Sequence, residues 1–192
     1  MVLKIIIASV RPGRAGKPIG DWFTKIAKKN KSFDVEVIDL AKINLPLLDE
    51  PELPRLQKYT KKHTKEWSKI IDEADAFIFV TPEYNFGYPP SLKNAIDYLH
   101  YEWGYKPLSF VSYGGISGGT RSVQQLKQIV TALNMMPIFE AVVIPMYIQY
   151  LNKTKRFVGN ENLKQSAKIM INKLYLWAKY MKPLREEIHK SE

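Results

Sequence analysis

Residues 9–19 bring together a hydroxyl, three cations and two glycines between an apolar run and an amphipathic one. Backbone N–H groups at a helix start favour anions, Ser9 can donate a hydrogen bond, and Arg11 and Arg14 can bind phosphate oxygens. The spacing matches neither the Gly-x-Gly-x-x-Gly nor the Walker pattern, so a mononucleotide phosphate fits better than the ligands of either. A solvated basic turn is the alternative.

A second segment, residues 82–90, carries aromatic and amide side chains directly after the apolar run 76–80. Tyr84, Asn85, Phe86 and Tyr88 suit a flat heteroaromatic ligand, although a structural turn packed by aromatics would use the same residue types. Glu83 has no evident carboxylate, histidine or serine partner for acid–base chemistry. We therefore interpret Glu83 as a residue that orders this loop.

The third segment, residues 113–121, is dense in glycine, which permits close backbone approach and positive φ angles. Ser117 and the N–H groups of Gly118 and Gly119 suit the carbonyl edge of a heterocycle. A flexible turn would leave the repeated glycine pairs unexplained. Arg121 is either a second anion contact, which we favour, or a charge at a helix start.

The elements that must position these loops alternate along the chain. Strand-like apolar runs cover residues 3–8, 35–40, 76–81, 108–113 and 141–144, and amphipathic helices are predicted over 19–29, 60–73, 91–99, 120–133 and 162–180. The alternation predicts an α/β fold, a doubly wound five-stranded parallel sheet with helices on both faces. In the flavodoxin-like strand order 2-1-3-4-5, the three loops meet at one crevice.

Two connecting features stand outside this regular pattern. Residues 43–57 form a long connection with three prolines, which would cover either a site or a partner subunit. Lys93 and Asp97 share one face of a predicted helix, and we interpret them as a surface ion pair.

The 192 residues, 45% hydrophobic, suffice for a single domain over residues 1–192. No apolar run approaches the roughly 18 residues of a membrane span, and we expect a soluble, cytoplasmic protein. Without cysteines the chain has no disulfides or thiol nucleophiles, and its three histidines are too scattered to predict a metal site. The net charge of +10 is dispersed over helix faces, so nucleic acid is not an expected partner.

The three loops together resemble the NADPH-dependent FMN reductase family, flavodoxin-like flavoproteins that include azobenzene, chromate and quinone reductases. The most specific part is the Pro82-Glu-Tyr-Asn85 loop, followed by Leu92-Lys-Asn-Ala-Ile-Asp97. Ala8-Ser-Val-Arg11 and the Tyr113-Gly-Gly115 loop support it, and the similarity spans residues 3–181.

The resemblance implies a residue-by-residue assignment of an FMN site. The phosphate would be bound by Ser9, Arg11, Arg14 and the backbone through Gly16, Lys17 and Ile19. The isoalloxazine and ribityl chain would be surrounded by Pro82, Glu83, Tyr84, Asn85 and Phe86, and the pyrimidine side would be lined by Gly114, Gly115, Ser117 and Gly118. The family usually has another hydroxyl or amide shortly after the arginine, whereas this chain has Gly16-Lys-Pro18. Phosphate binding would therefore depend more on charge and backbone.

The implied activity is transfer of two electrons from NADPH or NADH through bound FMN to quinones, azo compounds, metal oxyanions or free flavin. Orientation and electrostatics would come from the protein, with no dedicated catalytic side chain. The alternative is a non-enzymatic flavin-binding electron carrier or redox-sensing module. Relatives imply a homodimer, with a tetramer as the alternative, and Tyr98, Tyr101, Trp103 and Met135 are candidates for the contact.

Overall fold

The computed structural model describes residues 1–191; Glu192, the last residue of the predicted domain, lies outside them. Its sheet has the order β2-β1-β3-β4-β5, with β6 also paired to β4, and every pairing is parallel. The strands are β1 (Val2–Ile7), β2 (Asp34–Asp39), β3 (Ala76–Pro82), β4 (Pro107–Tyr113), β5 (Met136–Pro137) and β6 (Val142–Ile144). This confirms the predicted flavodoxin-like strand order.

The last position of the sheet differs from the prediction of one strand over residues 141–144. Two short strands share it, since both β5 and β6 pair with β4. The Met136 and Ile138 N–H groups donate to the Lys106 and Leu108 carbonyls of β4, and paired residues resume only at Val142. A strand of two residues is too short to be recognised in the sequence from an alternation of apolar and polar side chains.

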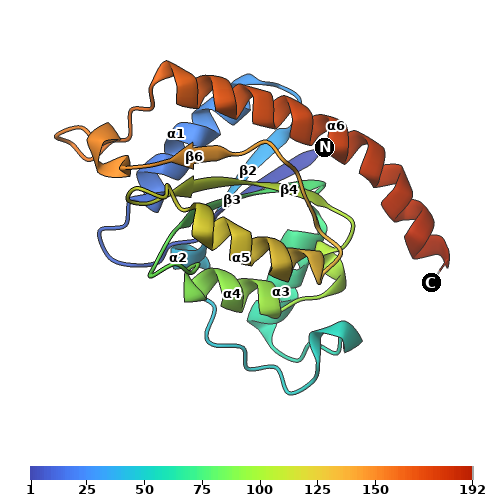
Figure 1. Ribbon diagram of the computed structural model, residues 1–192. Helices are drawn as coiled ribbons and strands as arrows, with labels where there is room; N and C mark the ends of the chain where they lie inside the picture. The colour runs from blue at the N-terminus through green and yellow to red at the C-terminus, as the bar shows by residue number, and fades with distance from the viewer. Residues whose placement is uncertain (192) are drawn as a thin grey trace.

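Helices cover both faces of the sheet, as predicted, with α1 and α6 on one side and α3, α4 and α5 on the other (Figure 1). The helices are α1 (Gly16–Lys29), α2 (Leu40–Ile43), α3 (Lys62–Asp72), α4 (Pro90–Asp97), α5 (Thr120–Thr131) and α6 (Glu161–Ser191); short 3-10 turns are η1 (Pro54–Leu56), η2 (Tyr101–Trp103) and η3 (Tyr147–Tyr150). Two bounds differ most from expectation: α1 begins at Gly16 and α6 continues past Pro183.

Alternating side chains of the central strands build a core on each face. Leu3, Ile5 and Ile7 pack toward α1 and α6, whereas Phe77 and Phe79 pack toward the opposite helices. Burial on both faces explains why these strands appear in the sequence as continuous apolar runs. Since all strands are parallel, the loops at their carboxyl ends lie along one edge of the sheet.

Three of the four residues proposed for a subunit contact belong to this core. Tyr98 and Trp103 are 0% exposed and Met135 is 2% exposed, so the prediction that they contact a partner is wrong. The Trp103 ring packs 5.1 Å from that of Phe77, and its indole N–H donates to the Ile96 carbonyl. Only Tyr101, at 46%, is exposed as expected.

No helix of the described residues has the length and hydropathy needed to span a membrane.

Candidate functional site

The three glycine- and aromatic-bearing loops meet at the carboxyl edge of the sheet, as the sequence predicts. They border a cleft of about 170 Å³ beside the start of α1. Its lining includes Arg11, Arg14, Glu83, Tyr84, Gly114 and Gly115. Residues from all three loops therefore face the same space.

The first turn of α1 is open toward an anion. Its N-cap residue, Ala15, has no side-chain hydrogen bond to the helix, and the turn contains no acidic residue. A Cβ on Gly16 would lie 2.3 Å from Ser9 Oγ and 2.7 Å from the Tyr113 hydroxyl, so only glycine allows this approach. The Tyr113 hydroxyl donates to the fully buried Ser9 Oγ at 3.2 Å. The helix start thus presents uncapped N–H groups beside an oriented serine hydroxyl.

Arg14 and Arg11 lie in different environments. The Arg14 guanidinium donates to both carboxylate oxygens of Asp39 at 2.6 Å and to the Ser9 carbonyl at 2.7 Å. Burial works to raise the pKa of Asp39, but the hydrogen bonds and positive charge of Arg14, together with the Ala41 N–H and the charge of Lys17, hold that pKa below its ordinary value. Arg11 is exposed and forms no ion pair within residues 1–191. Arg11 therefore keeps its full donor capacity for a ligand, while Arg14 fixes the loop.

The second loop turns sharply between Tyr84 and Gly87. These two residues exchange backbone hydrogen bonds of 2.9 Å, and the residues between them, Asn85 and Phe86, have φ angles of 48° and 70°. Positive φ at both central positions is a strained arrangement for a phenylalanine. The turn is braced because the Arg121 guanidinium lies 3.7 Å from the Phe86 ring centroid. It therefore holds a 61% exposed aromatic ring at the protein surface.

Glu83 connects the second loop to the third. Its carboxylate, 6% exposed, accepts from Arg121 Nε at 2.6 Å, from the Arg121 backbone N–H at 3.2 Å and from Ser117 Oγ at 2.8 Å. This confirms the interpretation that Glu83 orders the loop. The favoured assignment of Arg121 as an anion contact needs correction, because the anion that it binds is Glu83 itself.

The predicted site residues fall into two groups by position. Besides the lining residues above, Pro82 borders the cleft, and Ser9 and Gly16 lie directly behind it. The others are not part of its lining: Lys17, which pairs with Asp21; Ile19, in the core; Asn85 and Phe86, on the turn; and Ser117 and Gly118, at the start of α5. Glycine is needed at position 118 for packing, because a Cβ added there would lie 2.6 Å from Val143 Cγ1.

Two tyrosines of the cleft were absent from the predicted site. Tyr113 and Tyr147 both line it, with ring centroids 5.3 Å apart in an edge-on arrangement. Backbone hydrogen bonds from Met146 to Gly115 and from Tyr147 to Gly114 bring η3 to the cleft. Their place in the sequence could have indicated Tyr147, because residues 145–147 directly follow the last strand and so lie at the same edge of the sheet.

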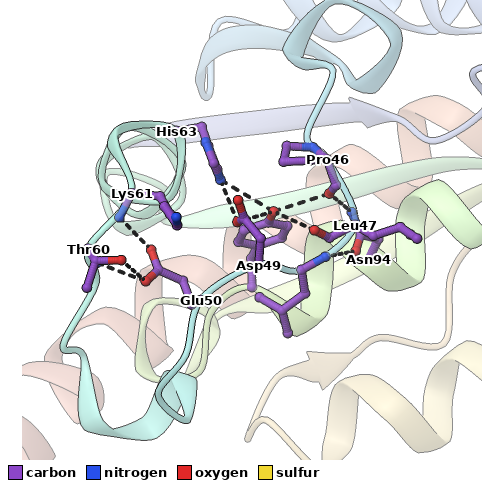
Figure 2. Close-up of polar contacts among 10 residues, drawn as sticks. Pro46, Leu47, Asp49, Glu50, Thr60, Lys61, His63 and Asn94 are labelled. Carbon is purple, nitrogen blue, oxygen red and sulfur yellow. Dashed lines mark hydrogen bonds and ion pairs between the residues drawn. The ribbon is translucent and has the colours of Figure 1, made fainter.

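The long connection between α2 and α3, residues 44–61, forms a strap that is fastened to α3 and α4 (Figure 2). Asp49 contacts His63 Nε2 at 2.8 Å and accepts from the Tyr98 hydroxyl at 3.2 Å, and Asn94 binds the strap backbone at Pro46 and Leu48. These contacts hold the strap over Tyr98, which accounts for the burial of that ring. Its position beside α4 leaves the cleft open.

The part of the chain that the structure describes contains no group of three or more histidine or acidic side chains able to hold a metal ion. The donors at the cleft are instead N–H groups, a guanidinium and hydroxyls. Such donors suit an organic phosphate.

The family of this chain follows from comparison with known proteins. The model of the family "NADPH-dependent FMN reductase" matches residues 1–149. The chain belongs to this family. It is 44% identical over 145 residues to an NAD(P)H-dependent FMN reductase of Schizosaccharomyces pombe, covering 73% of this chain and 72% of that protein. It is 36% identical to an NAD(P)H-dependent FMN reductase of Saccharomyces cerevisiae, with 70% of this chain and 76% of that protein covered.

More distant relatives extend along most of the chain. An FMN-dependent NADPH-azoreductase of Staphylococcus saprophyticus is 24% identical over 91% of this chain and 94% of its own length. The solved structure of FerB, a flavoenzyme NAD(P)H:acceptor oxidoreductase of Paracoccus denitrificans, superposes with a TM-score of 0.73 at 20% identity, covering 94% of this chain and 98% of that one. That likeness supports the flavodoxin-like fold.

Proposed function

We propose that this protein is an NAD(P)H-dependent FMN reductase that passes two electrons through bound FMN to quinones, azo compounds, metal oxyanions or free flavin. Family membership and the names of the relatives support a flavin-dependent reductase. The observation that carries the proposal is the uncapped start of α1, which meets the glycine loop after β4 at the carboxyl edge of the parallel sheet.

The residues of the cleft fit FMN. We assign the phosphate to the first turn of α1, the Ser9 hydroxyl and Arg11, and the Asp39 carboxylate is paired with Arg14 of the same loop. The volume of about 170 Å³ is below the roughly 300–1,000 Å³ of pockets that bury a whole ligand of this size. The cleft thus suits the phosphate and ribityl chain, with the flavin ring at its mouth beside Tyr84.

The protein's part in the reaction is to bind and orient. Bound FMN supplies the two-electron redox chemistry. Glu83, Ser117 and Arg121 hold the second and third loops in register, so that Tyr84 and Gly115 border the same opening. The open space beside Gly115 allows a flat ring to approach the backbone closely. An exposed ring face at the mouth would then be accessible first to the nicotinamide and afterwards to the acceptor.

The proposal includes one FMN-binding domain over residues 1–192, assembled as a homodimer in the cytoplasm, where NAD(P)H is available. Exposed apolar side chains on the loops around the cleft support a covering partner: Phe86 61%, Ile116 87%, Met146 56% and Ile148 71%. Light scattering of the FMN-loaded protein tests the dimer against a monomer or tetramer, and fractionation of cells tests the compartment.

Anaerobic titration of the FMN-loaded protein with NADPH tests the function directly. We expect the flavin absorption to bleach with about one equivalent of NADPH and to return when a quinone is added, since the reductase must complete both half-reactions. Bound flavin that NADPH fails to reduce would favour the carrier or sensor alternative. Failure to retain any FMN would overturn the assignment of the cleft.

A further inference from the structure

A second concave surface lies between α1 and α6, away from the cleft. This groove has a volume of about 520 Å³, within the roughly 300–1,000 Å³ of small-molecule sites. Its apolar wall is formed by Trp22, Ile26 and Ile171. It shares no residue with the cleft: the cleft reaches Ala15, the N-cap residue of α1, whereas the groove is lined by α1 residues from Trp22 onward.

The rim of the groove is strongly cationic. Lys25, Lys29, Lys164 and Lys168 line it, and no carboxylate does. Lys164 is paired with Glu161 at 2.6 Å, whereas Lys25, Lys29 and Lys168 make no ion pair within residues 1–191. Uncompensated positive charge over an apolar floor is complementary to a molecule that has an acidic head and an apolar body.

The aromatic wall is held in place before any ligand binds. The Trp22 ring packs edge-on against Phe157 at 5.1 Å, and a Cβ on Gly159 would lie 2.7 Å from the indole, so only glycine permits this contact. Among the hydrogen bonds of the described chain, none uses the Trp22 indole N–H. The wall therefore offers a ligand a fixed aromatic ring.

We propose that the α1–α6 groove is a second ligand site, which binds a small amphipathic anion, a carboxylate or sulfonate on a flat or chain-like apolar body. The three lysines without ion pairs hold the acidic group, and the apolar body lies against Trp22 and Ile26. The size of the groove favours one small molecule over a peptide. This site is independent of the flavin reductase function.

The four tryptophans permit a direct test by indole N–H spectroscopy of the 15N-labelled, FMN-loaded protein, with naphthalene-2-sulfonate as the probe. The Trp67 and Trp103 indoles already donate to Ala95 and Ile96, and Trp177 lies on another surface of α6. We expect a saturable shift of the Trp22 signal, assigned by its loss in Trp22→Phe, with the other three unchanged. A shift confined to Trp177 would overturn the proposal and place the ligand on α6.

Matched charge variants separate a site from general attraction to a basic protein. The variant Lys25→Gln/Lys29→Gln/Lys168→Gln should weaken binding about tenfold or more, because three partly exposed contacts are lost together. The control Lys28→Gln/Lys31→Gln/Lys179→Gln removes the same charge from exposed positions outside the groove and should change affinity less than about twofold. Equal weakening in both variants would overturn the proposal.

Two further probes define the chemistry and the source of the ligand. Decanoate, kept below its micelle concentration, should compete with the sulfonate, whereas neutral naphthalene-2-methanol should not. Equal binding of the neutral compound would overturn the assignment of an anion site. Vesicles containing phosphatidylglycerol should leave the Trp22 signal unshifted; a shift with vesicles and none with the free anions would identify a lipid surface instead of a small molecule.

Discussion

Two arginines of one loop have different tasks, although their sequence context is similar. The Arg14 side chain is 15% exposed and bound to Asp39, whose side chain is 6% exposed. Arg11 is exposed, borders the cleft and has no carboxylate partner in the described part of the chain. Arg14 therefore contributes to the stability of the loop, and Arg11 contributes charge toward a ligand.

Substitution of each arginine by glutamine should separate these tasks. We expect Arg11→Gln to weaken FMN binding about tenfold, through loss of one charge-assisted contact, and to leave riboflavin binding unchanged. Fluorescence titration with the two flavins measures the difference. Equal losses for FMN and riboflavin would contradict a phosphate contact by Arg11.

We expect Arg14→Gln to lower the free energy of unfolding by about 3 kcal/mol, because it leaves the buried Asp39 carboxylate unpaired. The folded pKa of Asp39 lies below its ordinary value, so the stabilisation is present above the ordinary pKa of about 4 and is lost as the pH falls through the folded value. The stability gap between wild type and Arg14→Gln should therefore narrow in acid. Urea unfolding at neutral pH and near pH 3 measures both effects.

Gly115 offers a test of ligand proximity that leaves the fold intact. A Cβ added there meets no atom within 4 Å, and its φ angle is not positive. Gly115→Ala should change the stability of the apoprotein by less than about 0.5 kcal/mol while weakening FMN binding, because the methyl group occupies space assigned to the flavin. The control Gly16→Ala should lower both the stability and the FMN affinity, because the added Cβ would lie 2.3 Å from Ser9 Oγ. Unchanged FMN affinity in Gly115→Ala would place the ring elsewhere.

At the scale of elements, the strap is a long irregular segment made rigid by its polar contacts. The Glu50 carboxylate accepts from the Thr60 hydroxyl and from the backbone N–H groups of Thr60 and Lys61, at 2.8 to 2.9 Å. Burial opposes ionisation, but these hydrogen bonds outweigh it and lower the pKa of Glu50 to about 2. Glu50 thereby closes the strap onto the start of α3 (Figure 2).

Glu50→Gln should open the strap locally. We expect faster amide hydrogen exchange at Thr60 and Lys61 with little change in global stability, since the contact lies at the surface. Because the folded pKa of Glu50 is lowered, the contact persists above about pH 4.5 and weakens as the pH falls toward 2. Glu52→Gln, at an exposed position of the same strap, is the matched control and should leave exchange unchanged.

The elements that periodicity predicts well are those buried along their whole length. The strand runs 3–8 and 76–81 are apolar because both faces are covered, and this burial is expressed residue by residue in the sequence. Long-range contacts leave no such local signal. Asp39 is 25 residues from Arg14, Tyr98 is buried by a strap about 50 residues away, and Tyr147 reaches the cleft through backbone hydrogen bonds. The sequence therefore predicted that the three loops meet at one edge of the sheet, but it did not indicate which distant residues they contact.

At the scale of the molecule, α6 extends the fold beyond residues 1–149, the part matched by the family model. It crosses the face of the sheet and projects past the chain's N-terminus (Figure 1). Its last turns are attached to Asp75, which lies just before β3. The Asp75 carboxylate accepts from the Val2 backbone N–H at 2.9 Å and contacts Lys182 at 3.1 Å and Arg185 at 3.0 Å. A single acidic group thus joins β1, β3 and the C-terminal helix.

Truncation should show that this attachment stabilises the whole protein. A chain ending at Met181 loses both cations and leaves the 7% exposed Asp75 side chain with only the Val2 N–H, so we expect a loss of about 2–3 kcal/mol in unfolding free energy. A chain ending at Glu186 keeps both cations and should lose less than about 1 kcal/mol.

The stabilisation by Asp75 should depend on pH. Burial works to raise the pKa of Asp75, but its hydrogen bonds and the two cations outweigh burial and hold the pKa below its ordinary value. The stabilisation is therefore present above the ordinary pKa of about 4 and disappears as the pH falls through the folded value. Urea unfolding should show that the two truncated chains differ in unfolding free energy at pH 7 and that this difference shrinks toward pH 3. A difference independent of pH would assign the loss to apolar packing of α6.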